Sequence, residues 1–187
     1  MYRKLLRLLP ALVLAGVAFV LLAGPRRAAA EGTKVGVLPA DDARVVKQIH
    51  RYRHVTWRWQ DVMGARRTPA TRGVETDPSR AYRLWVRSLW HRRAIRALRR
   101  ASHPPHRPAW LCIHRHEGRW HDPNPPYYGG LQMDIGFQRT YGRRLLRRKG
   151  TADHWTPLEQ IWVAERARRS GRGFYPWPNT ARACGLI

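Results

Sequence analysis

Hydrophobic side chains recur at helical spacing along two segments in the first half of the chain. Between residues 41 and 63 they are Val45, Ile49, Tyr52, Trp59 and Met63. A second run follows Asp77 and Pro78, which indicate a helix N-cap and a proline at the first helical position. It extends to residue 101 through Tyr82, Trp85, Val86, Leu89, Trp90 and Leu98. The polar stretch 64–77 separates the runs, and the sequence HPPHRP at 103–108 ends the second. The pattern predicts a helical accessory region over 41–104, formed by two helices with their tryptophans packed inside.

The remaining residues, 105–187, carry shorter helical signals between segments rich in tryptophan, glycine and proline. Three helices are expected here: one over 110–117 that ends at Gly118, one that includes Leu145 and Leu146, and one that runs from the capping box Thr156–Glu159 to about Gly171. The stretch PNPPYYGG at 123–130 is expected to be a loop, and no strand pattern is evident. The predicted fold class is mainly α, a small helical domain with long loops preceded by the helical pair.

The first thirty residues have the composition of a targeting segment. A basic start leads into an apolar run from Leu8 to Gly24, and Ala28-Ala29-Ala30 suits cleavage by signal peptidase before Glu31. An uncleaved signal anchor is the alternative, although the run, about seventeen residues, is short for crossing a bilayer. Either reading places the rest of the chain outside the cytoplasm, secreted or in the cell envelope, with residues 31–40 as a linker.

The cysteine count and the charge both fit an exported protein. Cys112 and Cys184 are the only cysteines, and a lone pair in an exported chain favours one disulfide over two free thiols. The formal net charge is +24, and all but four of the 36 basic residues are arginine. Such a charge favours polyanionic surroundings, whether nucleic acid, anionic lipid or an acidic cell wall. The alternative is that arginine simply fills solvent-facing helix positions.

The stretch WLCIHRHEGRW at 110–120 concentrates candidate chemistry. His116, Glu117 and His121 resemble a zincin helix motif, but that motif needs histidines four residues apart. Here they are five apart, about 140° around a helix axis, and Gly118 is expected to end the helix between them. Cys112 shares a helix face with His116 but has a use in a disulfide. We therefore expect no metal and no cofactor, and interpret the histidines as solvated.

A catalytic carboxylic acid is the other interpretation of this stretch. Among the six carboxylates of residues 109–187, local roles account for four: Glu159 in the capping box, Glu165 beside Arg168 or Arg169, Asp122 in a turn and Asp153 in a loop. Glu117 and Asp134 remain as candidates. Trp110 and Trp120 near Glu117 would favour its protonated form, while Arg115 and Arg119 would favour the carboxylate. The sequence alone leaves open whether Glu117 is catalytic or a surface residue.

Several motifs from Trp110 to Cys184 together resemble the catalytic domain of resuscitation-promoting factors. These are transglycosylase-like, peptidoglycan-cleaving domains with a core similar to c-type lysozyme. The family has a tryptophan seven residues before its catalytic glutamate, as Trp110 stands before Glu117 here. The other shared motifs follow in family order: Trp120, YYGGLQ at 127–132, EQIWVAER at 159–166 and GFYPWP at 173–178.

The resemblance implies cleavage of the β-1,4 bond between N-acetylmuramic acid and N-acetylglucosamine, with Glu117 as the general acid. Asp134 is the candidate second carboxylate for hydrolysis, whereas a lytic transglycosylase needs none. The implied glycan-binding residues are Trp120, Tyr127, Tyr128, Gly129, Gly130 and Gln132. The implied partners are peptidoglycan strands, with anionic wall polymers as a further possibility, no specific nucleic acid, and a membrane only if the N-terminal segment stays uncleaved.

The chain also departs from the family pattern. The family's cysteines stand where His116 and Thr180 stand here, so both cysteines have moved by four residues. A four-residue shift keeps a residue on the same helix face, and we predict the disulfide Cys112–Cys184. The family's ESGGNW is shortened to EGRW beside the acid. A non-catalytic wall-binding protein is therefore one alternative function, and a basic nucleic-acid binder is a second.

Overall fold

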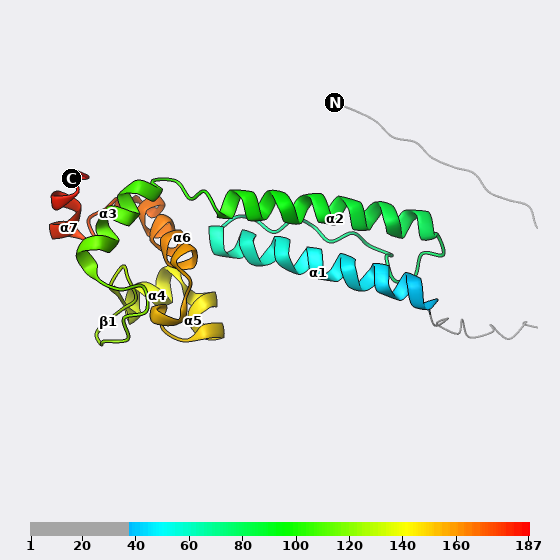
Figure 1. Ribbon diagram of the computed structural model, residues 1–187, viewed down its shortest axis with the longest axis horizontal. Helices are drawn as coiled ribbons and strands as arrows, with labels where there is room; N and C mark the ends of the chain where they lie inside the picture. Colours follow the sequence, from blue (N-terminus) through cyan, green and yellow to red (C-terminus); the bar gives the residue numbers. More distant parts are fainter. Residues whose placement is uncertain (1–37) are drawn as a thin grey trace, which may run out of the picture. The chain divides into compact units, whose positions relative to one another are not determined.

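The computed structural model describes residues 38–187, and this part of the chain is mainly helical, as predicted (Figure 1). The predicted signal segment and most of the predicted linker lie outside the described residues. Within residues 38–187, no helix is both long and apolar enough to cross a membrane.

The helical pair is formed by α1 (Ala40–Met63) and α2 (Arg80–Ala101), which run side by side in the same direction (Figure 1). At their N-terminal ends, buried Asp42 of α1 pairs with Arg83 and Arg80 of α2 at 2.5 and 2.7 Å. Parallel helices require a connection that returns along their whole length. The connecting segment 64–79 has that reach, since sixteen extended residues span about 50 Å and α1 is about 36 Å long.

This connecting segment packs between the helices through side-chain hydrogen bonds. Trp57 of α1 donates to the carbonyl oxygen of Thr68 at 2.7 Å, and Trp90 of α2 donates to the hydroxyl of Thr71 at 2.5 Å. Val74 is fully buried among the apolar residues of both helices. The segment expected to be a polar loop therefore completes the small core of the pair.

The start of α2 differs from the prediction. Ser79, in extended conformation, is the N-cap, and its hydroxyl accepts from the amide of Tyr82 at 3.1 Å. Asp77 instead accepts from the amide of Ser79 at 2.7 Å and forms the turn before the helix. Pro78 consequently lies outside the helix rather than at its first position. The prediction that the tryptophans of these helices pack inside also has one exception, Trp85, which is 54% exposed.

The rest of the chain surrounds one almost wholly buried helix, α6 (Pro157–Ala167). The capping box of Thr156 and Glu159 starts it as predicted, and it passes into a π-helical turn, Arg168–Arg172. Around it lie α3 (Arg107–Glu117), α4 (Ile135–Tyr141), α5 (Arg143–Lys149), the 3₁₀ turn Ala152–His154 and α7 (Pro178–Ala183). Their shared core includes fully buried Trp110 and Trp155.

Three details of this region were not predicted. Helix α3 begins three residues earlier than expected, at Arg107, with Pro108 in its first turn. Helix α4 carried no recognised signal. The end of the expected loop 123–130 forms β1 (Tyr127–Tyr128), which pairs in a short antiparallel hairpin with β2 (Met133–Asp134), beyond that loop. Strands of two residues are too short to show an alternating pattern.

The C-terminal ends of α1 and α2 contact α6 and the π-helical turn that follows it. Trp162 of α6 donates to the carbonyl oxygen of Ala101 at 2.8 Å, and Arg169 donates to that of Met63 at 2.8 Å. Arg58 of α1 reaches the buried carboxylate of Glu159 at 3.2 Å. The helical pair is thus joined to the C-terminal region by directional contacts at one end.

Candidate functional site

Glu117 is the last residue of α3 and lies partly buried at its C-terminal end. Gly118 ends the helix with φ 148° and ψ −169°, a conformation open to glycine. The Glu117 Oε1 atom accepts a hydrogen bond from the hydroxyl of Thr180 at 2.7 Å. Thr180 belongs to α7, so the position of the carboxylate depends on how α3 and α7 are held together.

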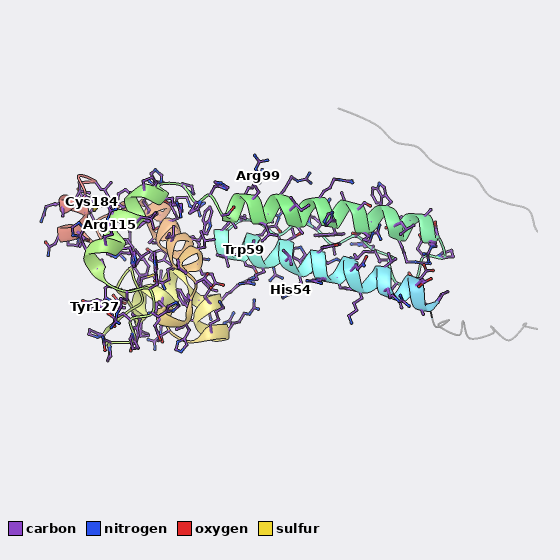
Figure 2. The ribbon with its side chains drawn as sticks, in the orientation of Figure 1. His54, Trp59, Arg99, Arg115, Tyr127 and Cys184 are labelled. Carbon is purple, nitrogen blue, oxygen red and sulfur yellow. A yellow bond between two sulfur atoms is a disulfide. The ribbon has the colours of Figure 1, made fainter. Side chains whose placement is uncertain are left out.

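The disulfide Cys112–Cys184 provides that connection and confirms the predicted pairing (Figure 2). Its Cα atoms lie 6.0 Å apart, within the usual range for a disulfide. Cys112 lies on α3 a little more than one turn before Glu117, and Cys184 directly follows α7. The bond therefore fixes the two helices close to the Glu117–Thr180 contact.

The hairpin places Gln132 beside the same helix end. Gln132 has a positive φ of 47°, uncommon for a residue with a side chain. Its amide donates to the carboxylate of Asp122 at 2.9 Å and to the carbonyl oxygen of Gly129 at 3.2 Å. A Cβ atom on Gly118 would lie 3.3 Å from this amide nitrogen. The Gln132 side chain is therefore packed against the residue that follows Glu117.

Gly129 and Gly130 are both buried, and side chains of the protein fill the space next to them. A Cβ atom on Gly129 would lie 2.6 Å from the Gln160 amide oxygen, and one on Gly130 would lie 2.6 Å from the His114 ring. That ring stacks on Trp120 with centroids 3.8 Å apart. Close packing therefore accounts for glycine at positions 129 and 130, and stacking on His114 gives Trp120 a structural role.

A surface pocket of about 210 Å³ lies beside the hairpin. Its polar lining includes Gln132, Asp134 and half-exposed Tyr127, and its floor includes Pro176 and buried Trp177. Of the predicted site residues, these three line the pocket. The others do not: Glu117, Trp120, Tyr128, Gly129 and Gly130.

Asp134 serves as the N-cap of α4, and its Oδ1 atom accepts from the amide of Phe137 at 2.7 Å. This bond satisfies one of the free amides in the first turn of the helix. Asp134 thus combines a local structural role with a place in the pocket lining. Tyr127, which lines the same pocket, lies in β1 of the hairpin and is labelled in Figure 2.

Two other carboxylates of this region are fully buried and satisfied. Burial raises the pKa of Glu159, but hydrogen bonds from Lys149, the Thr156 amide and Arg58 outweigh it and hold the pKa below its ordinary value. Glu165 accepts from Trp110 Nε1 at 2.7 Å and from Arg168 at 3.3 Å, the second contact as predicted. Both are therefore part of the framework.

The side chains considered for a metal do not form a set of ligands. Cys112, His116 and Cys184 place their ligand atoms within 4.8 Å of one another. Because the two sulfur atoms are bonded to each other, only the imidazole of His116 remains to offer a metal ion. His121 contacts the carbonyl oxygen of Asp153 at 2.7 Å. This arrangement does not resemble the helical histidine pair of a zincin.

Sequence reasoning missed Thr180 and Asp122 as parts of the site. From the sequence, Thr180 is only the residue where the family has a cysteine, and Asp122 is only a turn residue. The signal for Thr180 was the four-residue displacement of both cysteines, which leaves a different pair of side chains at the original positions.

Comparisons of this chain with protein-family models, with curated proteins and with solved structures find no match.

Proposed function

We propose that this protein is an exported peptidoglycan-cleaving glycosidase that acts on the β-1,4 bond between N-acetylmuramic acid and N-acetylglucosamine, with Glu117 as its general acid. The proposal combines the motif resemblance with the surroundings of Glu117. A lysozyme-like arrangement of the C-terminal region and a location in the cell envelope are parts of the same proposal.

The observation that carries the proposal is the set of partners of the carboxylates. The chain has twelve acidic residues, and all but Glu31, hence eleven, lie in residues 38–187. Ten of these bind a basic side chain, a backbone amide or a side-chain amide. Glu117 is the exception, because its hydrogen bond comes from a hydroxyl alone. Glu117 is therefore the one carboxyl group of the described residues that neither a cation nor an amide holds in place, which leaves it to act on a substrate.

A single-acid mechanism agrees with these contacts. Protonated Glu117 would donate its proton to the glycosidic oxygen as the bond from that oxygen to C1 of the muramic acid breaks. The 6-hydroxyl of the same sugar would then attack C1 and return a proton to the Glu117 carboxylate, giving a 1,6-anhydro product. Asp134 is engaged as the N-cap of α4. This favours the single-acid route, because that route requires no second carboxylate. Thr180 would orient the acid by its hydrogen bond.

The pocket beside the hairpin is the proposed binding site for part of the glycan. Tyr127 offers an exposed ring for a sugar face, and Gln132 offers its side-chain oxygen to hydroxyl or N-acetyl groups. Because Gln132 also packs against Gly118, a sugar bound to it would extend towards the end of α3. Glu117 would then act at the edge of this pocket.

The test is a digest of purified sacculi by the full chain and by Glu117→Gln, with released muropeptides identified by mass spectrometry. The expected result is release by the wild type alone, with anhydro ends. Products heavier by one water would keep the glycosidase but give water the role of the nucleophile. Retention of both proteins on the wall without release would refute catalysis and favour a wall-binding protein.

A further inference from the structure

A long part of the chain contains no acidic residue. Between Asp77 and Glu117 the sequence has ten arginines and neither aspartate nor glutamate. This stretch includes all of α2 and most of α3. The arginines near the C-terminal end of α2 therefore have no carboxylate on their own helix with which to pair.

Several of these arginines surround a groove beside the C-terminal ends of α1 and α2. The groove consists of two adjoining hollows of about 600 and 270 Å³, which share Met63, Arg96 and Arg100 in their linings. We call it the arginine groove, after the five arginines that line it: Arg66, Arg93, Arg96, Arg99 and Arg100. Figure 2 labels Arg99 near the end of α2.

Neither lining contains an acidic residue, and none of the five arginines forms an ion pair with any residue of the described part of the chain. Four of them are exposed, and Arg93 is partly buried against Trp90. Burial and the charge of Arg96 lower the pKa of Arg93. Like charges at helical spacing destabilise a helix, so an anion bound here would relieve an existing repulsion.

The floor of the groove differs from its rim. Met63, Ala97 and Trp162 are buried and present apolar atoms, and Pro105 continues this surface. The cations extend from Arg66, in the connecting segment, along one side of α2 to Arg99. A site with charges along its length and an apolar floor suits an extended chain in which anionic groups alternate with carbon-rich units.

We propose that the arginine groove binds a linear phosphodiester-linked sugar or polyol polymer of the cell wall. Arginine pairs with phosphate through two parallel hydrogen bonds, and its weak hydration makes it the preferred cation for this contact. Sugar or polyol units between the phosphates would lie over the floor, of which Pro105 is the exposed apolar residue. The match of charge between the five arginines and a row of phosphates is the basis of the assignment.

Two other polyanionic partners fit the groove less well. Single-stranded nucleic acid is normally held by aromatic rings that stack on its bases, whereas Trp162 is only 6% exposed. A lipid bilayer presents a flat surface, which would meet the exposed arginines of the rim but not the buried floor. The phosphodiester polymer meets both the charge and the shape.

The location of this polymer in a cell wall rests on the proposed function, but binding itself does not. A protein anchored by its helical pair to a wall polymer would keep the Glu117 region near peptidoglycan. The groove and Glu117 lie on different elements, so their roles can be tested separately.

The experiment measures binding of the full chain to purified poly(glycerol phosphate) by calorimetry at several salt concentrations. The groove variant is R96Q/R99Q/R100Q, which changes three exposed arginines on the rim. The matched control is R139Q/R143Q/R147Q, which removes the same charge from exposed positions of α4 and α5. Circular dichroism melting of both variants verifies that each is folded.

We expect the groove variant to bind at least about tenfold more weakly and the slope of log affinity against log salt to fall by about 2 to 3, one for each lost phosphate contact. The control should keep its affinity within about twofold. An equal loss in both variants would overturn the proposal, because net charge alone would then explain binding.

Three competing probes test the identity of the polymer: poly-glutamate, a single-stranded DNA oligonucleotide of matched charge, and phosphatidylglycerol vesicles. Tighter binding of any of them through the same three arginines would overturn the phosphodiester assignment. Because no peptidoglycan is present, failure here leaves the sacculus digest unaffected. Conversely, an inactive protein in that digest leaves this measurement unaffected.

Discussion

Removing the disulfide should weaken the folded state by an amount that the length of its loop determines. Cys112 and Cys184 are separated by 72 residues, and the loop between them includes most of the C-terminal region. In the chain-entropy model, closing a loop of that length lowers the entropy of the unfolded chain by about 15 cal/mol/K. At 25 °C this corresponds to about 4 kcal/mol. The variant C112S/C184S should lose stability by this amount.

The assay is equilibrium unfolding in urea, followed by tryptophan fluorescence, under conditions where the transition is two-state. With a slope of about 2 kcal/mol/M, the loss should lower the urea midpoint by roughly 2 M. A thermal melt should show a decrease of about 10 °C, since 1 kcal/mol shifts the melting temperature of a protein of this size by roughly 2–4 °C. Both measurements compare the variant with the oxidised wild type.

Reduction supplies the control for this prediction. Dithiothreitol should move the wild type to the stability of C112S/C184S and leave the variant unchanged. A difference below about 1 kcal/mol between oxidised wild type and variant would refute the reasoning. It would mean that α3 and α7 stay together in the unfolded chain, so that the bond removes little entropy.

Three further predictions each rest on single contacts. Glu159→Gln should lower the free energy of unfolding by about 2 kcal/mol at pH 7, because it removes the buried carboxylate from its ion pairs. The folded-state pKa of Glu159 is below its ordinary value of 4.5, so the wild type should lose this contribution as the pH falls below 4.5 and through the folded-state pKa. Urea unfolding across pH 3–7 would measure the loss. Gly130→Ala should lower the free energy of unfolding by about 2–3 kcal/mol through overpacking. Gly185→Ala, where a Cβ atom meets no other atom within 4 Å, should lower it by about 1 kcal/mol because of the positive φ of Gly185. Equal melting temperatures for the two variants would contradict the packing argument. If Glu117 is the catalytic acid, Thr180→Val should slow muropeptide release about tenfold, the effect of losing one orienting hydrogen bond, and Thr180→Ser should restore most of it; a valine variant as fast as the wild type would remove Thr180 from the site.

The predictable parts of the fold are those that a few neighbouring residues determine. The capping box of Thr156 and Glu159 defines the start of α6, because both of its hydrogen bonds form within four residues. Gly118 ends α3 as expected for the same local reason. The disulfide could also be predicted, and the structure confirms it. A helix repeats its faces every three to four residues, so a cysteine moved by one turn can still reach its partner.

Features that depend on distant contacts were not predictable from the pattern. The parallel direction of α1 and α2 follows from how Thr68 and Thr71 fasten the connecting segment, and no local motif encodes this. At the start of α2, both Asp77 and Ser79 are good N-cap residues. The contact of Asp77 with the Ser79 amide decided between them.

The candidate site shows the same division between local and distant determinants. Glu117 was identified from its neighbours in sequence, yet its partner Thr180 lies 63 residues away. Asp134 caps α4, a helix whose presence the sequence did not indicate. Gly130 is required by the His114 ring, which approaches from another element. In each case the residue was recognised, and its physical role became defined only by a contact across the fold.

The excess of basic over acidic residues connects the two proposals. Six of the 36 basic residues precede residue 38, so the described part of the chain has 30, against eleven acidic residues. With so few acids, most arginines must lie without a carboxylate, and their repulsion is smallest when they spread over the surface. The arginine groove departs from that expectation, because five arginines line two adjoining hollows that lack any acid. Glu117 departs in the opposite sense, since an acid amid so many cations is bound only by a hydroxyl. Pairing either group with an opposite charge inside the protein would have stabilised the fold. The two proposals therefore assign both groups to molecules outside the fold: the arginines to an anion and Glu117 to a glycan.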